Sequence, residues 1–188
     1  ISIDTDQGYY IPILFPNNID TMIKPEINYK NIFERIAPIF NCSKTLYLGQ
    51  NIKYDILILK RYGIDVNGNM FDTMIAAHLI DPDRRSYKMD LLSLDYLEYE
   101  MMPIEKLIGP KGKNQKLMSD VELEKISYYA CEDSDIALQL FKIFSEELSK
   151  NNLNEIFNEI EIPTMKVLID MEFEGINIDI SFFEKLSV

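Results

Sequence analysis

The sequence predicts an α/β or α+β domain, in which strands and helices are mixed along one chain. Two patterns indicate this. Short apolar stretches end at Gly, Asn or Pro, as strands do. Longer stretches repeat apolar residues every three or four positions, as amphipathic helices do. With 188 residues, the chain is long enough for one domain with a full core and some excess.

The first half of the chain predicts a hairpin followed by alternating helices and strands. A strand over Ile1–Asp4 leads to a turn at Asp6–Gly8 and a return strand over Tyr9–Leu14. Gly63 stops the second helix and Pro82 ends the third. The further elements are a helix over 28–40, a buried strand over 45–48, a helix over 52–62, a strand over 66–71 around a turn at Gly68, and helices over 73–80 and 90–97.

The second half predicts two long helices separated by a short break. The first covers residues 120–149 and the second covers 153–174, with Asn151-Asn152 between them. Gly175 ends the second helix, and we expect a strand to start over 176–180.

Composition and charge exclude some kinds of function. The net charge of −12 argues against a protein that holds duplex DNA by neutralising phosphates, because that needs a basic face. It does not argue against an enzyme that binds a few nucleotides through metal ions held by carboxylates. The single histidine, His78, argues against a zinc site or a serine–histidine triad.

The cysteine count suggests a cellular compartment, and the first residue suggests that the chain belongs to a longer protein. Cys42 and Cys131 cannot form a disulfide framework, which favours a reducing compartment, the cytoplasm. No apolar stretch reaches the roughly 18 residues that a membrane span needs. The first residue is not Met, so we expect the chain to be a fragment of a longer protein.

The first long helix carries an acid on its apolar face. Asp133 lies on a stripe with the three- or four-residue spacing of a buried face, and Tyr129 lies one turn earlier. The other members of the stripe are Ile126, Ala130, Ala137, Leu140, Phe144 and Leu148. A carboxylate in that position needs a partner or a metal ion. A buried acid satisfied by a hydroxyl or a backbone group remains an alternative.

A second acid opens the helix predicted over 52–62. Asn51 follows a strand and is a candidate N-cap residue. Asp55 lies one turn further on, among apolar neighbours. A surface acid favoured by the positive end of the helix is the alternative for Asp55.

Several segments resemble a known enzyme family. NIKYD at 51–55 and YACED at 129–133 resemble motifs II and III of the DEDDy exonucleases. GQNIKYD, FDTMIAAHLI, KGKNQ and YACEDSDIALQL resemble the 3′–5′ exonuclease-like domain of family A DNA polymerases. The resemblance implies a ribonuclease H-like α/β fold, a mixed sheet flanked by helices, over 1–150. Residues 151–188, which include EIEIPTMKVLIDMEFEGINID, would begin the polymerase domain.

The resemblance also implies a reaction and its residues. Two divalent metal ions, Mg²⁺ or Mn²⁺, would promote hydrolysis of the last phosphodiester of a single-stranded or frayed 3′ end of DNA. Asp55 would act in the outer metal site, Asp133 would bind the first ion, and Tyr129 would orient the attacking water. Gln50 and Asn51 would lie near the terminal nucleotide. The polymerase domain of the same chain would be the partner.

The sequence departs from the family because motif I, an Asp-x-Glu pair, is missing. Phe71-Asp72-Thr73 imitates motif I but follows motif II, so we interpret it as a strand-to-helix turn. Asp4 and Asp6 precede GYYIPI, which ends a hairpin in the family, so we interpret them as turn residues. We therefore expect the first catalytic strand to be missing, and the 188-residue chain to hydrolyse DNA poorly or not at all.

Two alternative functions remain open. The domain could be an inactive scaffold of the same polymerase, but retention of Asp55, Tyr129 and Asp133 favours an active enzyme. A ribonuclease D-like enzyme acting on RNA is the other alternative, and the second long helix followed by GINID argues against it.

Two basic segments have open roles. The stretch 109–116, GPKGKNQK, predicts a mobile loop that could touch DNA or the polymerase domain. Arg84 and Arg85 could contact a phosphate or simply belong to a turn that ends a helix.

Overall fold

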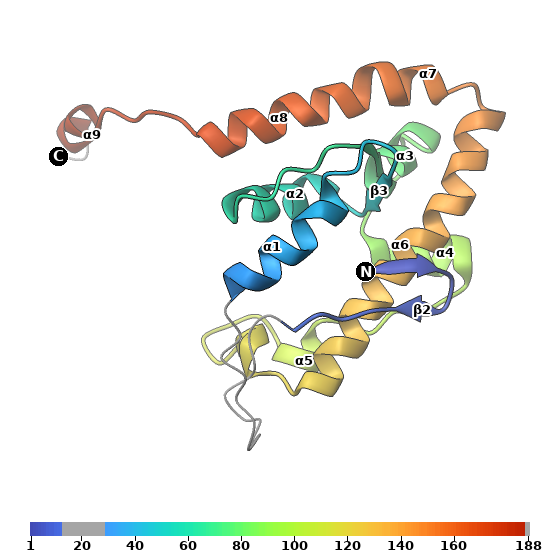
Figure 1. Ribbon diagram of the computed structural model, residues 1–188, viewed down its shortest axis with the longest axis horizontal. Coiled ribbons are helices and arrows are strands. Elements are labelled where there is room, and N and C mark those ends of the chain that lie inside the picture. The colour runs from blue at the N-terminus through green and yellow to red at the C-terminus, as the bar shows by residue number, and fades with distance from the viewer. Residues whose placement is uncertain (13–28, 187–188) are drawn as a thin grey trace.

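The computed structural model describes residues 1–12 and 29–186. Helices dominate, and the strands are short (Figure 1). In chain order the strands are β1 (Ser2–Asp4), β2 (Gln7–Gly8), β3 (Leu46–Gly49) and β4 (Asn69–Asp72). The helices are α1 (Tyr29–Phe40), α2 (Ile52–Arg61), α3 (Thr73–Ile80), α4 (Met89–Leu97), α5 (Glu105–Ile108), η1 (Met118–Asp120), α6 (Leu123–Lys150), α7 (Asn154–Ile156), η2 (Phe157–Glu161), α8 (Ile162–Glu174) and α9 (Ile180–Leu186).

The described strands form two separate pairs. β1 and β2 are antiparallel, with Ser2 opposite Gly8. β3 and β4 are parallel, from Leu46 opposite Asn69 to Gly49 opposite Asp72. A parallel pair needs a crossover connection, and α2 provides it. The result is a domain of mixed helices and strands, as the sequence predicts.

The long helix α6 organises the core. It contacts α3, α4, β1, β2 and β3, so it joins both strand pairs (Figure 1). Leu140, Phe144 and Leu148 on its predicted apolar stripe are fully buried. Phe144 packs edge-to-face against Tyr96 of α4, with ring centroids 4.9 Å apart. Burial of these side chains is the main stabilising contribution of α6.

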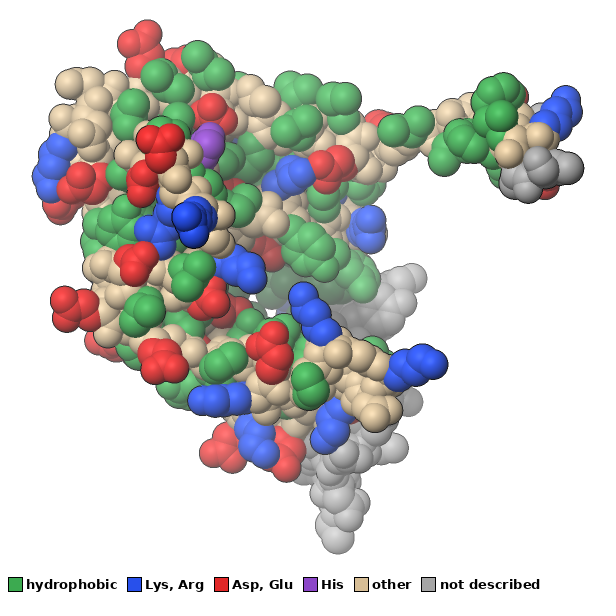
Figure 2. All heavy atoms as spheres, turned by 180° about the vertical axis from the view of Figure 1, so that it is seen from behind, with side chains coloured by type: hydrophobic (Ala, Val, Ile, Leu, Met, Phe, Trp, Pro, Cys, Tyr) green, Lys and Arg blue, Asp and Glu red, His purple; other side chains and the backbone are tan. Residues whose placement is uncertain are grey.

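The helices after α6 lie along one side of the molecule and end in a projecting segment. α8 contacts α2 and β4, and ion pairs join Lys53 to Glu172 and Lys60 to Asp170. Beyond Gly175 the chain leaves the body, and α9 stands apart from it (Figures 1 and 2). No helix in the described ranges has both the length and the apolar character needed to cross a membrane.

The predicted helices are confirmed with small shifts at their ends. The prediction over 73–80 matches α3, and those over 52–62, 90–97 and 120–149 match α2, α4 and α6. α1 covers 29–40, and residue 28 of that prediction lies outside the described residues. The prediction over 153–174 is continuous but includes the π-helical turn η2. Gly175 ends it with a positive φ of 76°.

The hairpin is confirmed, but its return strand lies earlier than predicted. β2 covers Gln7–Gly8, and the turn falls on Thr5 and Asp6. Two backbone hydrogen bonds between Ile1 and Tyr9, of 2.8 and 2.9 Å, continue the pairing. Residues 13 and 14 of the predicted strand lie outside the described residues. Gly8 fits here because a Cβ at this position would lie 2.4 Å from the Cβ of Cys131 on α6.

Three strand predictions need correction. Residues 176–179 form no strand, and α9 begins at Ile180, because no strand of the described chain lies beside them to pair with. The strand predicted over 45–48 exists as β3 but is not buried: Leu46 is 41% exposed. The strand predicted over 66–71 is shorter, because β4 pairs with β3 only from Asn69 onward.

Candidate active site

A cleft opens between the two strand pairs and α6. It has a volume of about 570 Å³, and its walls come from β1, β3, α2 and α6. Most of the lining is apolar, for example Ile3, Leu48 and Ala137. The carboxylates in it are Asp55 and Asp133, both predicted from the sequence.

Asp133 enters the cleft from the middle of α6. Its side chain is half-buried, in line with its place on the apolar stripe. Burial raises its pKa to about 6, and the neighbouring charge of Glu132 acts in the same direction. Tyr129, one turn earlier, is also half-buried, and its burial and the charge of Asp133 raise its pKa to about 12. The phenol therefore keeps its proton at neutral pH.

Asp55 enters the cleft from the first turn of α2. The residue is exposed at the cleft surface, but its carboxyl group is partly desolvated, which raises its pKa to about 6. The charge of Asp72 adds to this rise. Gly49 lies beside this carboxyl group, since a Cβ on Gly49 would be in van der Waals contact with Asp55 Oδ2 at 3.6 Å.

The structure brings these two acids together although 78 positions separate them in the sequence (133 − 55). They line the same cleft, and the negative charge of Asp55 contributes to the raised pKa of Asp133. Two negative charges in one cleft disfavour each other, and a cation bound near both would relieve this repulsion.

The turn before α2 differs from the prediction. Asn51 occupies the N-cap position, but its side chain makes no capping hydrogen bond, and its backbone is left-handed, with φ 55° and ψ 48°. The carboxylate of Asp72 caps α2 instead: it accepts the N–H groups of Asn51 at 3.1 Å and Ile52 at 2.9 Å. The predicted cap by Asn51 is wrong: an N-cap residue normally has an extended backbone, whereas Asn51 is left-handed and its side chain accepts no N–H of the first turn.

Gln50, predicted to lie near a terminal nucleotide, is held by its neighbours. Its Nε2 donates to the carbonyl of Tyr87 at 2.6 Å, and the hydroxyl of Thr73 donates to its Oε1. Both ends of the Gln50 amide are therefore engaged within the fold.

The turn acids of the hairpin lie outside the cleft, as the sequence predicts. Asp4 Oδ1 accepts the N–H of Thr5 at 2.8 Å, which is typical of a turn. The N–H of Asp6 donates to Oδ1 of Asp135 on α6 at 2.8 Å. Neither Asp4 nor Asp6 is among the residues that line the cleft.

Comparison with known proteins decides the family. Residues 1–149 match the sequence pattern of the family described as 3′–5′ exonuclease. This chain belongs to the 3′–5′ exonuclease family. The resemblance seen in the sequence is confirmed, and exonucleases of this family generally depend on divalent metal ions.

The chain is also similar to several proteins named DNA polymerase I. It is 37% identical to that of Borreliella burgdorferi over 95% of this chain and 18% of the relative. It is 28% identical to that of Rhizobium leguminosarum over 95% of this chain and 18% of the relative. The same identity holds for Chloroflexus aurantiacus over 99% of this chain and 19% of the relative. The chain thus spans about a fifth of the length of these relatives.

The donors in the cleft suit a hard divalent cation but do not complete its coordination. Within residues 1–12 and 29–186, no group of three or more His, Cys, Asp or Glu side chains lies close enough to hold a metal ion. Asp55 and Asp133 provide carboxylate oxygens, which suit Mg²⁺ or Mn²⁺. Such ions take about six ligands, so water, substrate oxygens or further side chains would supply the rest.

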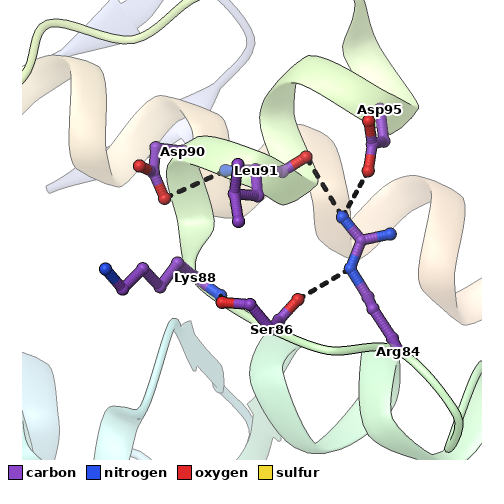
Figure 3. A network of polar contacts seen from close by, with 6 residues as sticks. All are labelled: Arg84, Ser86, Lys88, Asp90, Leu91 and Asp95. Carbon is purple, nitrogen blue, oxygen red and sulfur yellow. Dashed lines mark hydrogen bonds and ion pairs between the residues drawn. The ribbon is translucent and has the colours of Figure 1, made fainter.

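Arg84, one of the two arginines with an open role, is engaged within the exonuclease fold (Figure 3). Its Nε donates to the carbonyl of Ser86 at 2.8 Å, and its Nη2 donates to that of Leu91 at 3.3 Å. The same nitrogen pairs with Asp95 of α4. These bonds stabilise the loop that presents the Tyr87 carbonyl, so we assign Arg84 to the turn rather than to a phosphate.

Sequence reasoning missed one buried acid beside the site. Glu132 is 9% exposed and accepts hydrogen bonds from the Tyr99 hydroxyl at 2.8 Å and the Met102 N–H at 2.9 Å. It thereby ties the segment after α4 to α6, next to Asp133. Its sequence signal was weak, because Glu132 lies beside the stripe and an acid on a helix flank is normally solvated.

Proposed function

We propose that residues 1–150 form the proofreading 3′–5′ exonuclease domain of a DNA polymerase I. The substrate is the single-stranded or frayed 3′ end of DNA. The proposal rests on one observation: two acids distant in sequence, Asp55 and Asp133, line one cleft, and the Tyr129 hydroxyl lies within hydrogen-bonding reach of Asp133. The family match over residues 1–149 and the relatives named DNA polymerase I support it.

The surroundings of Asp133, Asp55 and Tyr129 support the roles predicted for them. Asp133 and Asp55 would hold divalent metal ions through their carboxylates, which must be deprotonated to do so. Such ions would supply positive charge beside the scissile phosphate. Tyr129, with its pKa raised to about 12, stays protonated and orients the attacking water. Asn51 and Gln50 form the turn beside the terminal nucleotide.

The reaction is hydrolysis. Water oxygen bonds to phosphorus while the bond from phosphorus to the 3′ oxygen breaks. The products are a 5′-nucleotide and a DNA strand with a new 3′ hydroxyl.

We also propose that a further strand completes the sheet in the intact protein. Among the residues that the structure describes, β1 and β3 each pair with one neighbour only, and both line the apolar cleft. A strand placed between them would join the two pairs into the mixed sheet of a ribonuclease H-like fold. It would also bring the Asp-x-Glu carboxylates of motif I next to Asp55 and Asp133, and supply the missing donors. Without that strand, the 188-residue chain would hydrolyse DNA poorly.

Residues 151–188 are proposed to begin the polymerase domain. The family match ends at residue 149. The segment after Gly175 leaves the body and carries exposed apolar side chains: Ile176 is 89% exposed and Ile180 is 69% exposed (Figure 2). Large exposed apolar side chains gathered on one segment mark an interaction site.

A nuclease assay on the intact protein that contains these residues tests the function. With 5′-labelled single-stranded DNA and Mg²⁺ or Mn²⁺, we expect stepwise trimming from the 3′ end. Asp133→Ala and Asp55→Ala should lower the rate by about 100-fold or more, as expected when metal-ligand groups are lost. Asp83→Ala, which removes an exposed carboxylate of the loop before α4, is the matched control and should leave the rate unchanged.

Two results would contradict the proposal. An intact protein that never trims DNA would indicate an inactive scaffold. Faster trimming of RNA than of DNA would indicate a ribonuclease.

A further inference from the structure

One buried carboxylate caps the starts of two helices. Asp72 ends β4 and is 1% exposed. Its Oδ1 accepts the N–H groups of Met74 at 2.8 Å and Ile75 at 3.3 Å, which open α3. The same oxygen accepts the N–H of Asn51 at 3.1 Å, and Oδ2 accepts the N–H of Ile52 at 2.9 Å. These last two groups open α2, which crosses over from β3 to β4.

The start of α2 depends on these hydrogen bonds to Asp72, because the side chain of its own N-cap residue makes no capping bond. The Asn51 side chain makes no capping bond, and its backbone is left-handed. The next residue, Thr73, adds a further link to the turn before α2: its one hydroxyl proton lies between Gln50 Oε1 and the carbonyl oxygen of Gly49, which is 3.1 Å from the hydroxyl oxygen. Asp55 lies in the first turn of α2, so the place where α2 begins sets the place of its carboxyl group.

We infer that Asp72 is a positioning residue of the nuclease, which fixes the start of α2, and with it Asn51 and Asp55, against α3. This inference rests on the proposed function, in which Asp55 binds metal. Asp72 itself cannot bind the metal ion, because it is buried and its two oxygens are occupied by four backbone N–H groups.

An ordinary N-cap explains only half of the arrangement. A cap needs one acceptor atom and serves one helix. Asp72 serves two helices with two oxygens, and only the α2 side bears on the candidate site. A variant that removes the α2 side and keeps the α3 side therefore separates positioning from simple capping.

Asp72→Asn removes part of the α2 side: it breaks the bond to the N–H of Ile52, the first residue of α2, and keeps both bonds to α3. Its single carbonyl oxygen is expected to replace Oδ1, which faces three of the four N–H groups. The amide NH₂ then faces the N–H of Ile52, and two donors cannot bond to each other. Asp72→Ser is a second variant, since a serine hydroxyl can cap α3 but is too short to reach α2.

Leu148→Ala is the matched control for lost stability. Leu148 is 1% exposed in the core at the far end of α6, fifteen positions beyond Asp133 (148 − 133). Its truncation destabilises the fold without touching the start of α2.

The first measurement, on the intact protein, is the Mg²⁺ concentration that gives half-maximal trimming of DNA. We expect Asp72→Asn and Asp72→Ser to raise it by about 10- to 100-fold, the range for residues that orient metal ligands, with the KM for DNA changed by less than about threefold. Leu148→Ala should lower the melting temperature but leave the half-activating Mg²⁺ concentration unchanged. Equal effects of Asp72→Asn and Leu148→Ala on the metal requirement would overturn the inference.

The second measurement needs no activity. Amide hydrogen exchange of the intact protein compares the segment 50–56 with the segment 73–80. In Asp72→Asn we expect exchange to be at least about tenfold faster in 50–56 and unchanged in 73–80, because local opening follows lost hydrogen bonds. Unchanged exchange in both segments would overturn the inference even if the wild-type protein trims DNA. If the wild-type protein does not trim DNA, the proposed function fails, and the exchange result alone decides whether Asp72 fixes the start of α2.

Discussion

Asparagine in place of Asp133 is expected to make the metal-free protein more stable at pH 8. Asp133 is half-buried in the cleft, and burial together with the charge of Glu132 raises its pKa from 3.8 to about 6. At about 1.4 kcal/mol for each pKa unit, this difference corresponds to about 3 kcal/mol. Solvent at the cleft mouth reduces the effect, so we expect a gain of about 1–3 kcal/mol in the free energy of unfolding.

The effect depends on pH in a defined direction. Between pH 3.8 and about 6, the folded protein keeps the Asp133 proton, while the unfolded chain has lost it. The folded state binds more protons in this window, so the free energy of unfolding falls as the pH rises through it. The asparagine side chain carries no charge at pH 4 or at pH 8. Asp133→Asn should therefore be more stable than the wild type at pH 8, with little or no difference at pH 4.

Urea unfolding of the 188-residue chain at both pH values in EDTA measures this difference. Asp83→Asn, which removes an exposed carboxylate, is the control and should change stability by less than about 0.5 kcal/mol. In the intact protein, Mg²⁺ should stabilise the wild type more than Asp133→Asn, because ligands stabilise the state that binds them. A variant that is less stable than the wild type at pH 8, or that gains equally at pH 4, would refute the reasoning.

Three further substitutions test separate features of the structure. Tyr129→Phe should lower the trimming rate of the intact protein by about 10- to 100-fold with little change in its melting temperature; an unchanged rate would exclude the phenol from the reaction. Glu132→Ala leaves the Tyr99 hydroxyl and a backbone N–H without their acceptor, so urea unfolding should show a loss of about 2–3 kcal/mol. Gly8→Ala would place a Cβ 2.4 Å from the Cβ of Cys131, so the hairpin must shift away from α6. We expect about 1–3 kcal/mol of destabilisation in the same measurement, and full stability would show that the hairpin docks more loosely.

Helices were predicted well because their signals are local. The spacing of apolar residues in α6 and the stop signals after α2 and α3 depend on neighbours within a few positions. Strands were predicted less well because each needs a partner that the local sequence does not reveal. β2 pairs earlier than its apolar residues indicate, and residues 176–179 have strand-like composition but form no pair.

The sequence by itself indicated the family, the main helices and the two acids: Asp133 because it interrupts an apolar stripe, and Asp55 because it lies in the segment NIKYD. Only the tertiary structure decided that Asp55 and Asp133 line one cleft and that Asp72, not Asn51, begins α2. The physical reason is the range of the interactions. Helix periodicity acts over three or four residues, whereas a shared cleft and a bridging carboxylate join segments that only the packed chain brings within hydrogen-bonding or Coulomb distance.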